Sequence, residues 1–265
     1  MKDFTQAYVS NVLPHFKEGF LNKWGFEEYN NPNKPCVFLG LYSQEDVNIF
    51  LNHKSYRIIS LGGNDMHPPQ LNLLKKIVDF KTTFYWQSPG TPSDIAKQYN
   101  IPHKELYVAM KDYSNFTPTP LGEDIYVYMG SPDNQRLEYF KYKEIVNPLV
   151  EVFGEDRVKW VFQKESSPLS MDKLVENYYN NCFVYIKPNN LGGATSMWEL
   201  AHMGRRTLGN GFPNLSYTSG YKDIYHLIEL VQEEAKYMGT IREDVVNEVK
   251  KTFIGEEWLS LNYWI

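Results

Sequence analysis

The chain has 265 residues, which is enough for one large domain or for two domains of about 100–150 residues each. Hydrophobic residues make up 42 % of it and aromatic residues 15 %, a composition that supports packed cores and excludes an intrinsically disordered chain. The net charge of −5 argues against a broad nucleic-acid-binding surface, although a local basic pocket remains compatible with it.

The first half of the chain alternates between short apolar strands and helical patterns. Before the alternation begins, apolar residues at helical spacing predict a long helix from Phe4 to about Tyr29, kinked or divided at Pro14. The strands that follow are predicted at 36–42, 56–63, 82–87 and 105–110, and the helices at 44–53, 69–80 and 91–100. Such alternation is typical of a parallel sheet covered on both faces.

Residues 111–122 interrupt this alternation, because FTPTPLGED has two prolines, a glycine and no periodicity. We interpret the segment as a connection between two domains. The alternation then resumes, with strands predicted at 124–130 and 157–163, helices at 136–154, 170–181 and 222–238, and a strand–loop–helix–turn–strand unit over 182–211. The aromatic-rich tail FIGEEWLSLNYWI is expected to pack on a neighbouring part of the protein.

The predicted fold is therefore α/β, with two doubly wound, Rossmann-like domains that face a cleft. We place the domains at 1–115 and 116–245, followed by a tail at 246–265 that packs back on the first domain. Ligands of open parallel sheets bind beyond the carboxyl ends of the strands. Two such edges facing each other would form a site for two substrates.

The loop Gly192-Gly193-Ala194-Thr195-Ser196 is the strongest indication of a ligand. It opens a predicted helix, whose first N–H groups are unpaired and lie at the positive end of the helix dipole, so it suits a phosphate. Glu199 follows one turn later in an otherwise apolar helix and could bind the hydroxyl groups of a ribose. The alternative is a salt bridge from Glu199 to Arg205 or Arg206.

A second candidate lies in the first domain, in the loop LGGNDMHPP at 61–69. The carboxylate of Asp65 could bind hydroxyl groups of a substrate or remove a proton from one of them. The alternative is that Gly-Gly-Asn-Asp before two prolines only forms a turn, and for His67 this structural interpretation is the better one. The remaining histidines are scattered, and no spacing predicts a metal site.

Three segments of the second half resemble the nucleotide-sugar-binding domain of GT-B glycosyltransferases, in particular the large retaining group typified by sucrose and lipopolysaccharide mannosyl- and glucosyltransferases. These segments are YMGSPDNQRLEYFK at 128–141, LSMDKLVENYYNNCFVYIKP at 169–188 and LGGATSMWELAHMGRRTLGNG at 191–211. The stretch at 88–120 is similar to the last helix, strand and linker of the family's first domain. Together the matches cover about Gly62 to Gly211.

The resemblance implies a donor-side site at the following residues: Gly130, Ser131, Arg136, Lys141, Lys164, Met171, Gly192, Gly193, Ala194, Thr195, Ser196 and Glu199. Arg136 and Lys141 would supply positive charge, although a solvated helix face explains them equally well. Lys164 and Met171 correspond to positions that meet the base in the family, while Met171 could also simply pack at a helix start. The resemblance implies catalysis by Asp65 and Glu199.

Three departures from the family pattern stand out. Leu191 occupies the position of the family's first glutamate, which contacts the transferred sugar, and Ser131 replaces an arginine. The first domain is short and is expected to lack the family's first strand and glycine-rich loop. Such trimmed forms are typical of phage-like and other compact genomes, which would place the protein in the cytoplasm of a host.

The resemblance implies a retaining hexosyltransferase that moves a sugar from a nucleoside-diphosphate-sugar, such as a UDP- or GDP-sugar, to a hydroxyl of a glycan or small acceptor. It implies no cofactor and no metal, and the sequence contains no Asp-x-Asp motif that would hold a cation. One alternative is a non-catalytic nucleotide-sugar-binding or scaffold protein on the same fold. Another is a DNA-modifying glucosyltransferase, which the acidic net charge disfavours.

Compartment and membrane association follow from simpler features. Cys36 and Cys182 lie in apolar runs and are expected to be buried, reduced thiols. The start MKDFTQAYVS lacks the basic and apolar regions of a signal peptide, and no apolar run approaches membrane-spanning length. We therefore expect a cytoplasmic protein with no membrane span and no nucleic-acid partner.

Overall fold

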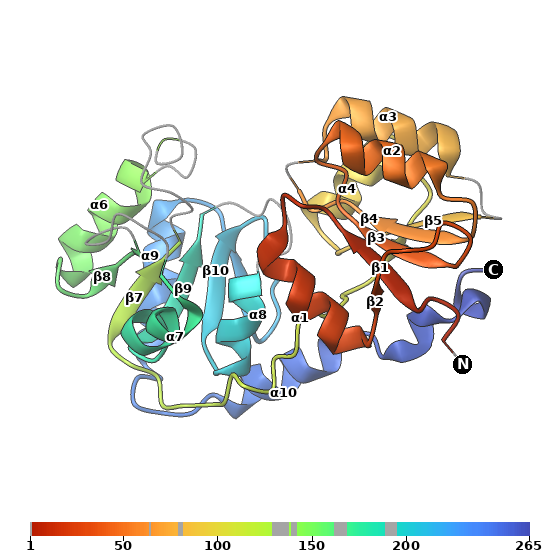
Figure 1. Ribbon diagram of the computed structural model, residues 1–265. Coiled ribbons are helices and arrows are strands. Elements are labelled where there is room, and N and C mark those ends of the chain that lie inside the picture. Colours follow the sequence, from red (N-terminus) through yellow and green to blue (C-terminus); the bar gives the residue numbers. More distant parts are fainter. Residues whose placement is uncertain are drawn as a thin grey trace. The chain divides into compact units, whose positions relative to one another are not determined.

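The structure is a computed structural model that describes residues 2–63, 65–78, 82–128, 138, 142–161, 169–188 and 195–265 (Figure 1). The chain divides into two compact units. Unit 1 contains residues up to Asp112 and returns with Thr252–Ile265, whereas unit 2 contains Tyr113 to Lys251 apart from a short stretch. For comparison, the sequence places the domain boundary at 115 and the start of the tail at 246.

Unit 1 is built on a six-stranded sheet in which all pairings are parallel. The strand order is β2-β1-β3-β4-β5-β6 (Figure 1). The strands are β1 (Gln6–Val9), β2 (Glu27–Glu28), β3 (Cys36–Leu39), β4 (Arg57–Ser60), β5 (Thr83–Gln87) and β6 (Lys104–Glu105). The helices are α1 (Pro14–Trp24), α2 (Gln44–Asn52), α3 (Pro68–Ile77) and α4 (Thr91–Gln98).

The predicted helix from Phe4 to Tyr29 is wrong at its start, and the first strand that we expected to be missing is present as β1. This strand lies between β2 and β3 and is buried on both faces, so it lacks the alternating pattern that identifies a half-exposed strand. Gln6, which is fully buried, donates from its amide to the carbonyl oxygens of Asn31 and Lys34 at 2.6 and 3.0 Å. The helix begins only at Pro14, where the missing proline N–H costs nothing.

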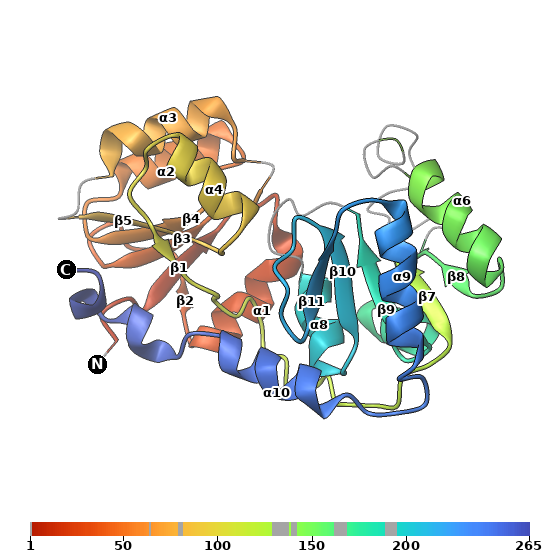
Figure 2. The ribbon, with the colours of Figure 1, turned by 180° about the vertical axis from the view of Figure 1, so that it is seen from behind.

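Side chains of the unit 1 strands alternate between two cores. Phe38, Ile59 and Tyr85 point toward α2, α3 and α4, which lie on the same side of the sheet in both views (Figure 2). Phe84 and Trp86 point the other way, where their rings lie 5.5 and 6.1 Å from those of Trp264 and Trp258. The C-terminal segment is thus part of the core of unit 1.

The C-terminal segment also explains why the strand predicted at 105–110 stops at Glu105. Beyond this point the backbone bonds to other parts of unit 1 instead of extending the sheet. The carbonyl oxygen of Tyr107 accepts from the Ile254 N–H at 2.9 Å, and that of Ala109 accepts from the Trp24 indole at 2.8 Å. Apolar composition alone cannot distinguish these two uses of a buried segment.

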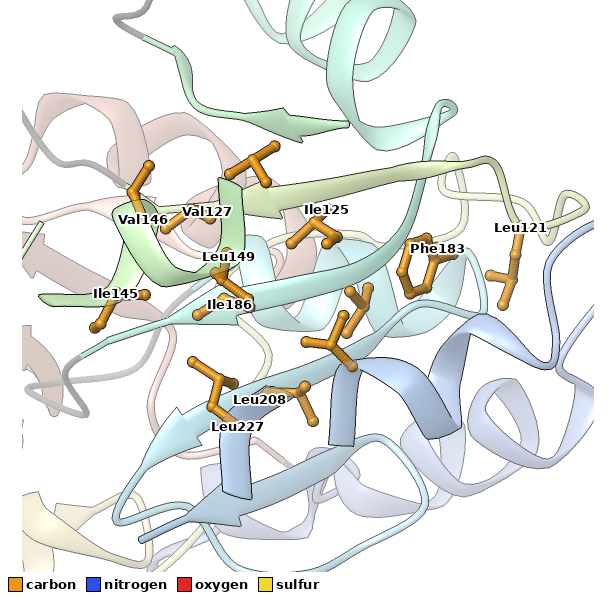
Figure 3. Packing of buried hydrophobic residues seen from close by; sticks show 13 residues of the cluster. Leu121, Ile125, Val127, Ile145, Val146, Leu149, Phe183, Ile186, Leu208 and Leu227 are labelled. Atoms are coloured by element: carbon orange, nitrogen blue, oxygen red, sulfur yellow. The ribbon is translucent and has the colours of Figure 1, made fainter. Parts of the chain in front are cut away.

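Unit 2 has a five-stranded sheet, again with only parallel pairings, in the order β11-β10-β9-β7-β8. Its strands are β7 (Asp124–Val127), β8 (Val158–Lys159), β9 (Cys182–Lys187), β10 (Arg206–Asn210) and β11 (Thr218–Tyr221). Helices α6 (Tyr142–Phe153) and α9 (Ile224–Ala235) cover one face. Figure 3 shows Ile145, Leu149 and Leu227 of these helices packed on Ile186 and Leu208 of the strands.

The opposite face of this sheet carries α8 (Thr195–His202) and a helix that begins as α7 (Met171–Leu174) and continues as a π-helical turn, Val175–Tyr179. Strand β11 and helix α10 (Glu243–Thr252) are additional to the predicted elements. The sequence signal for β11 is weak, since TSGY contains a glycine and small polar residues. Among the residues that the structure describes, no helix combines the length and apolar character that crossing a membrane requires.

Candidate functional site

Helix α8 is placed by the β9–α8–β10 crossover, so its first turn lies at the edge of the unit 2 sheet where the strands end at their carboxyl termini. The hydroxyl groups of Ser196 and Tyr185 are 2.9 Å apart and join this first turn to the central strand β9. Thr195, the first helical residue, and Ser196 are both partly exposed. A helix therefore follows the glycine-rich segment, and it begins at the expected edge of the sheet.

Glu199 lies one turn further along α8, on the side that faces the sheet. Its residue is only 2 % exposed, and its carboxylate oxygen Oε2 accepts a 2.7 Å hydrogen bond from the hydroxyl of Tyr179. Burial, followed by the charge of Glu199, raises the pKa of Tyr179 far above its ordinary value, so this hydroxyl stays a donor. The contact holds the carboxylate in a defined orientation among aromatic rings.

The arginines proposed as alternative partners of Glu199 are engaged elsewhere. Arg205 is fully buried and donates to the backbone carbonyl oxygens of Thr119, Pro120, Asn180 and Met203.

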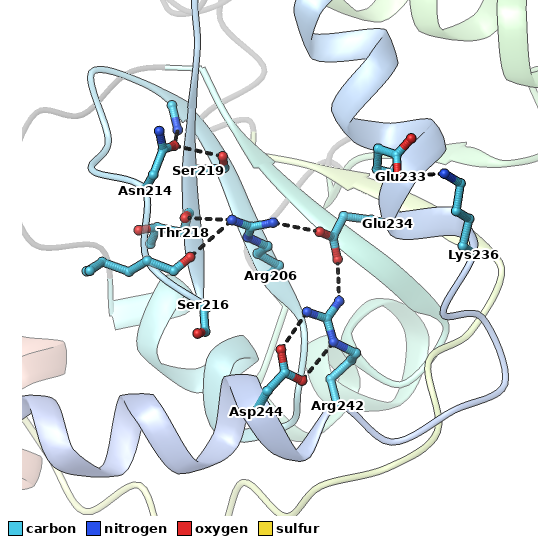
Figure 4. Close-up of polar contacts among 12 residues, drawn as sticks. Arg206, Asn214, Ser216, Thr218, Ser219, Glu233, Glu234, Lys236, Arg242 and Asp244 are labelled. Carbon is cyan, nitrogen blue, oxygen red and sulfur yellow. Dashed lines mark hydrogen bonds and ion pairs between the residues drawn. The ribbon is translucent and has the colours of Figure 1, made fainter.

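Arg206 takes part in a separate ion-pair network (Figure 4). Its guanidinium lies 3.0 Å from Glu234, whose other oxygen lies 2.8 Å from Arg242, and Arg242 in turn pairs with Asp244 at 2.7 Å. This network joins β10, α9 and the start of α10 within unit 2. The salt-bridge alternative for Glu199 thus loses both of the partners that we considered.

Asp65 in unit 1 is also buried, with 1 % exposed. One carboxylate oxygen accepts from the backbone N–H of Leu41 at 2.7 Å, and the other accepts from Gly62 at 2.7 Å and Gly63 at 3.0 Å. Burial raises the pKa of Asp65, and these hydrogen bonds oppose that effect without cancelling it. The contacts favour the interpretation in which Asp65 shapes the loops after β3 and β4.

A second buried carboxylate in unit 1, Asp46, went unnoticed in the sequence. Its oxygens accept from the hydroxyls of Tyr8 and Ser10 at 2.6 and 2.8 Å and from the N–H groups of Tyr42 and Ser43 at 2.8 and 2.7 Å. The capping box of α2, Ser43-x-x-Asp46, was the available signal, since an aspartate at this position bonds back to the start of its helix.

Lys187 was missed in unit 2. It ends the strand CFVYIK with 6 % of its surface exposed, and the signal was a charged residue at the end of a wholly apolar run.

The remaining predicted residues divide into two groups. Met171 begins α7 behind the capping residue Ser170 and is 41 % exposed, so it does not serve core packing. The predictions for Gly130, Ser131, Arg136, Lys141, Lys164, Gly192, Gly193 and Ala194 fall outside the described residues. In the described part of the chain, no three histidine, cysteine, aspartate or glutamate side chains are grouped as a metal ion would need.

Comparison with known proteins gave matches among solved structures only, since neither protein-family models nor curated proteins matched the chain. Sucrose-phosphate synthase from Thermosynechococcus elongatus is similar over 97 % of this chain and 78 % of its own, with a TM-score of 0.54 and 13 % identity. TarM is similar over 88 % of this chain, with a TM-score of 0.55 and 11 % identity. The chain has the GT-B fold.

At this level of identity, the GT-B likeness concerns the architecture and not the activity. This chain spans about 55 % of the length of the TarM structure. The predicted fold class of two parallel α/β sheets with flanking helices is confirmed.

Proposed function

We propose that the protein is a cytoplasmic glycosyltransferase that moves a hexose from a nucleoside-diphosphate-sugar to a hydroxyl acceptor, without a metal and with retention of configuration. The observation that carries the proposal is the position of α8 in a GT-B fold. Its N-terminus lies at the carboxyl edge of a parallel sheet, with an oriented, buried carboxylate one turn further along. Diphosphates bind at helix N-termini in such a setting because the unpaired N–H groups and the helix dipole both favour anions.

On the donor side, the hydroxyls of Thr195 and Ser196 and the backbone of Gly192–Ala194 are proposed to bind the diphosphate. Glu199 is proposed to accept hydrogen bonds from the ribose, since its buried carboxylate lies one turn beyond the proposed diphosphate site and is oriented by the hydroxyl of Tyr179. Gly130, Ser131, Arg136, Lys141, Lys164 and Met171 complete the proposed donor site.

On the acceptor side, Asp65 is proposed to act by holding the loops that would meet the acceptor. Both of its oxygens already bind backbone N–H groups, which supports a positioning role over direct removal of a proton.

Replacing Asp65 with asparagine would then reduce both the free energy of unfolding and the rate of sugar transfer. A general base would lower kcat with stability unchanged.

The reaction forms a bond between the acceptor oxygen and the anomeric carbon and breaks the bond from that carbon to the diphosphate. The electron pair of the broken bond leaves with the diphosphate, which also takes the proton of the acceptor hydroxyl. Fixed donors aimed at the leaving group stabilise the charge that develops there. The sequence has no Asp-x-Asp motif for a cation, which supports a role for these donors in place of a metal.

The proposal is tested by measuring binding and turnover in the presence of EDTA. UDP and GDP are titrated in a thermal-shift assay, and UDP-glucose and GDP-mannose are assayed for release of nucleoside diphosphate. A nucleotide at a hundred times its dissociation constant should raise the free energy of unfolding by about 2.7 kcal/mol. Binding that requires a divalent metal, or no binding of any nucleotide, would contradict the proposal.

The role of Glu199 is tested with Glu199→Gln against the matched control Glu233→Gln, because Glu233 is an exposed glutamate of α9 in the same unit. We expect nucleotide affinity to fall about tenfold or more in Glu199→Gln, as expected when a charged hydrogen-bond partner is lost, and to stay unchanged in the control. Tight nucleotide binding without turnover of any donor would favour the non-catalytic alternative.

A further inference from the structure

Lys187 is a buried cation that the described chain does not neutralise. Within the residues that the structure describes, its ammonium makes no hydrogen bond and no ion pair, and its one recorded contact is with the ring of Tyr128 at 5.6 Å. Two other buried cations of unit 2 have hydrogen-bond or ion-pair partners. Arg205 donates to four carbonyl oxygens, and Arg242 pairs with two carboxylates.

The position of Lys187 in the sheet is the one at which parallel α/β sheets bind ligands. The unit 2 order, with β7 and β9 adjacent and the remaining strands added on opposite sides, reverses direction between these two strands. Such a topological switch point leaves a crevice at the carboxyl ends of the two strands. Lys187 ends β9, and Tyr128 directly follows β7 beside it, with its N–H bonded to the Ile186 carbonyl at 2.8 Å.

Alternation along β9 places the Lys187 side chain on the face that carries α8. Beyond the register shift between Asp124 and Ile125, Val184 and Ile186 pack into the core under α6 and α9, so Tyr185 and Lys187 point to the opposite face. Tyr185 meets Ser196 in the first turn of α8. Lys187 is two residues, or about 7 Å, further toward the carboxyl edge, which brings it in front of the helix N-terminus.

The walls around this position are aromatic. Tyr128, directly after β7, flanks Lys187 on one side, and on the other side Gly209 of β10 is the pairing partner of Lys187. The ring of Phe212 covers Gly209 so closely that a Cβ atom added there would meet it at 2.1 Å. Burial among such groups lowers the pKa of Lys187 to about 8. An ammonium in this environment is unfavourable unless an anion accompanies it.

We infer that Lys187 binds the diphosphate of the nucleotide donor, together with the N-terminus of α8. This inference rests on the proposed function and deepens it by naming a cation of the donor site that the family resemblance did not supply. Lys187 would also supply a positive charge to a donor site in which Ser131 replaces the arginine that the resemblance implies.

The test compares Lys187→Met with the wild-type protein and with Lys236→Met, a control at an exposed lysine of unit 2 that pairs only with Glu233 in the described residues. Binding of UDP, GDP, uridine, guanosine and inorganic pyrophosphate is measured by calorimetry at pH 7. We expect Lys187→Met to weaken UDP or GDP, and pyrophosphate, by about 10- to 100-fold and to leave the nucleoside unchanged.

The outcomes separate this inference from the proposed function. Unchanged UDP and GDP affinity in Lys187→Met overturns the inference and leaves the proposed function standing. If no nucleotide binds the wild type but pyrophosphate binds through Lys187, the proposed function fails while the anion site remains.

A second measurement does not depend on the variant. The pKa of Lys187, followed by the NMR shift of its labelled Cε, should rise when pyrophosphate is added. A pKa that does not move on addition of a saturating anion overturns the inference.

Discussion

The two sheets place opposite buried charges at equivalent positions. In each sheet the second strand lies on one side of the first strand and the third lies on the other. The strand order therefore reverses between β1 and β3 in unit 1 and between β7 and β9 in unit 2. In unit 1 a carboxylate, Asp46, lies at this point with four donors from its own chain. In unit 2 an ammonium, Lys187, lies there without an acceptor among the described residues. The first arrangement is complete in itself, and the second is completed by a ligand.

The pKa values express the same difference. Burial alone would raise the pKa of Asp46, but the hydrogen bonds from Tyr8, Ser43 and Ser10 outweigh it and lower that pKa. For Lys187 burial acts without opposition, and the pKa falls to about 8. A charge stabilised in the native state contributes to folding, whereas a charge disfavoured there lowers the free energy of unfolding. Asp46 therefore supports its unit, and Lys187 weakens its unit until an anion binds.

The largest effect is expected from removing the satisfied charge. Asp46→Ala leaves two hydroxyls and two backbone N–H groups without their acceptor in a buried place, so we expect the free energy of unfolding to fall by about 3–4 kcal/mol. Urea denaturation measures this loss. Glu45→Ala, an exposed acidic residue in the same first helical turn, should cost less than about 1 kcal/mol. Equal losses in the two variants would remove the contrast between the switch points.

The opposite sign is expected for Lys187→Met. Without ligand, this variant should be more stable than the wild type by about 3 kcal/mol at pH 7, since a shift of the pKa from 10.5 to about 8 penalises the charged native state. Below pH 8 the lysine is protonated in both the folded and the unfolded state, and the penalty is complete. Between pH 8 and 10.5 only the unfolded state keeps the proton, so the wild type gains on the variant as the pH rises.

The comparison of unfolding curves at pH 7 and 9.5 checks this sign. The described residues on this face also include the titratable groups Tyr126, Tyr128, Tyr179, Tyr185 and Glu199. They are common to both proteins, so their contributions cancel in the difference. A Lys187→Met variant that is less stable than the wild type at pH 7 would show that the ammonium is satisfied in the native protein.

The sequence predicted the architecture well wherever one local pattern dominates. Strands such as CVFL and CFVYIK are continuous apolar runs, and the helices between them have good caps, as in Ser43 before α2. It failed at β1, because QAYV contains a buried glutamine whose partners are more than 20 residues away. Long-range hydrogen bonds of this kind leave no periodic trace in the local sequence.

The candidate site was predictable only in part, for the same reason. Glu199 stood out because a charged residue in an apolar helix requires a partner, but the partner, Tyr179, comes from a different helix and has no fixed spacing. Asp65 was recognised from its glycine-rich loop, while its bond to Leu41 depends on the neighbouring strand. Lys187 becomes informative only when the strand order is known, since the switch point is a property of the sheet.

A smaller, pH-dependent effect concerns a basic side chain that unit 1 keeps neutral. Burial lowers the pKa of His53 to about 4, and its ring lies against Tyr29 and Phe38. The unfolded state takes up a proton at His53 below pH 6.5, whereas the native state does not until about pH 4. The free energy of unfolding must therefore decrease as the pH is lowered from 6.5 to 4. We expect a loss of about 2 kcal/mol between pH 7 and 5.

Urea denaturation of His53→Gln at both pH values isolates this contribution. The variant loses some packing at every pH, so the decisive quantity is its pH slope, which should be smaller than that of the wild type by the stated amount. An unchanged slope would mean that the native state accepts the proton at His53. Unit 1 would then hold protonated His53 as a buried cation, as unit 2 holds Lys187. The two units would differ less in how they treat buried charge.

The smallest expected effect distinguishes the role of Glu199 from the role of Lys187 in unit 2. Tyr179→Phe removes the donor to Glu199, and we expect a loss of about 1–2 kcal/mol in the free energy of unfolding. If Glu199 binds the ribose and Lys187 the diphosphate, this variant should weaken UDP or GDP severalfold and leave pyrophosphate unchanged, whereas Lys187→Met weakens both. Tyr225→Phe, at a tyrosine that is 77 % exposed, serves as the control. Equal weakening of UDP and pyrophosphate by Tyr179→Phe would mean that Glu199 supports the anion site as a whole, because an oriented ribose acceptor cannot affect a ligand that has no ribose.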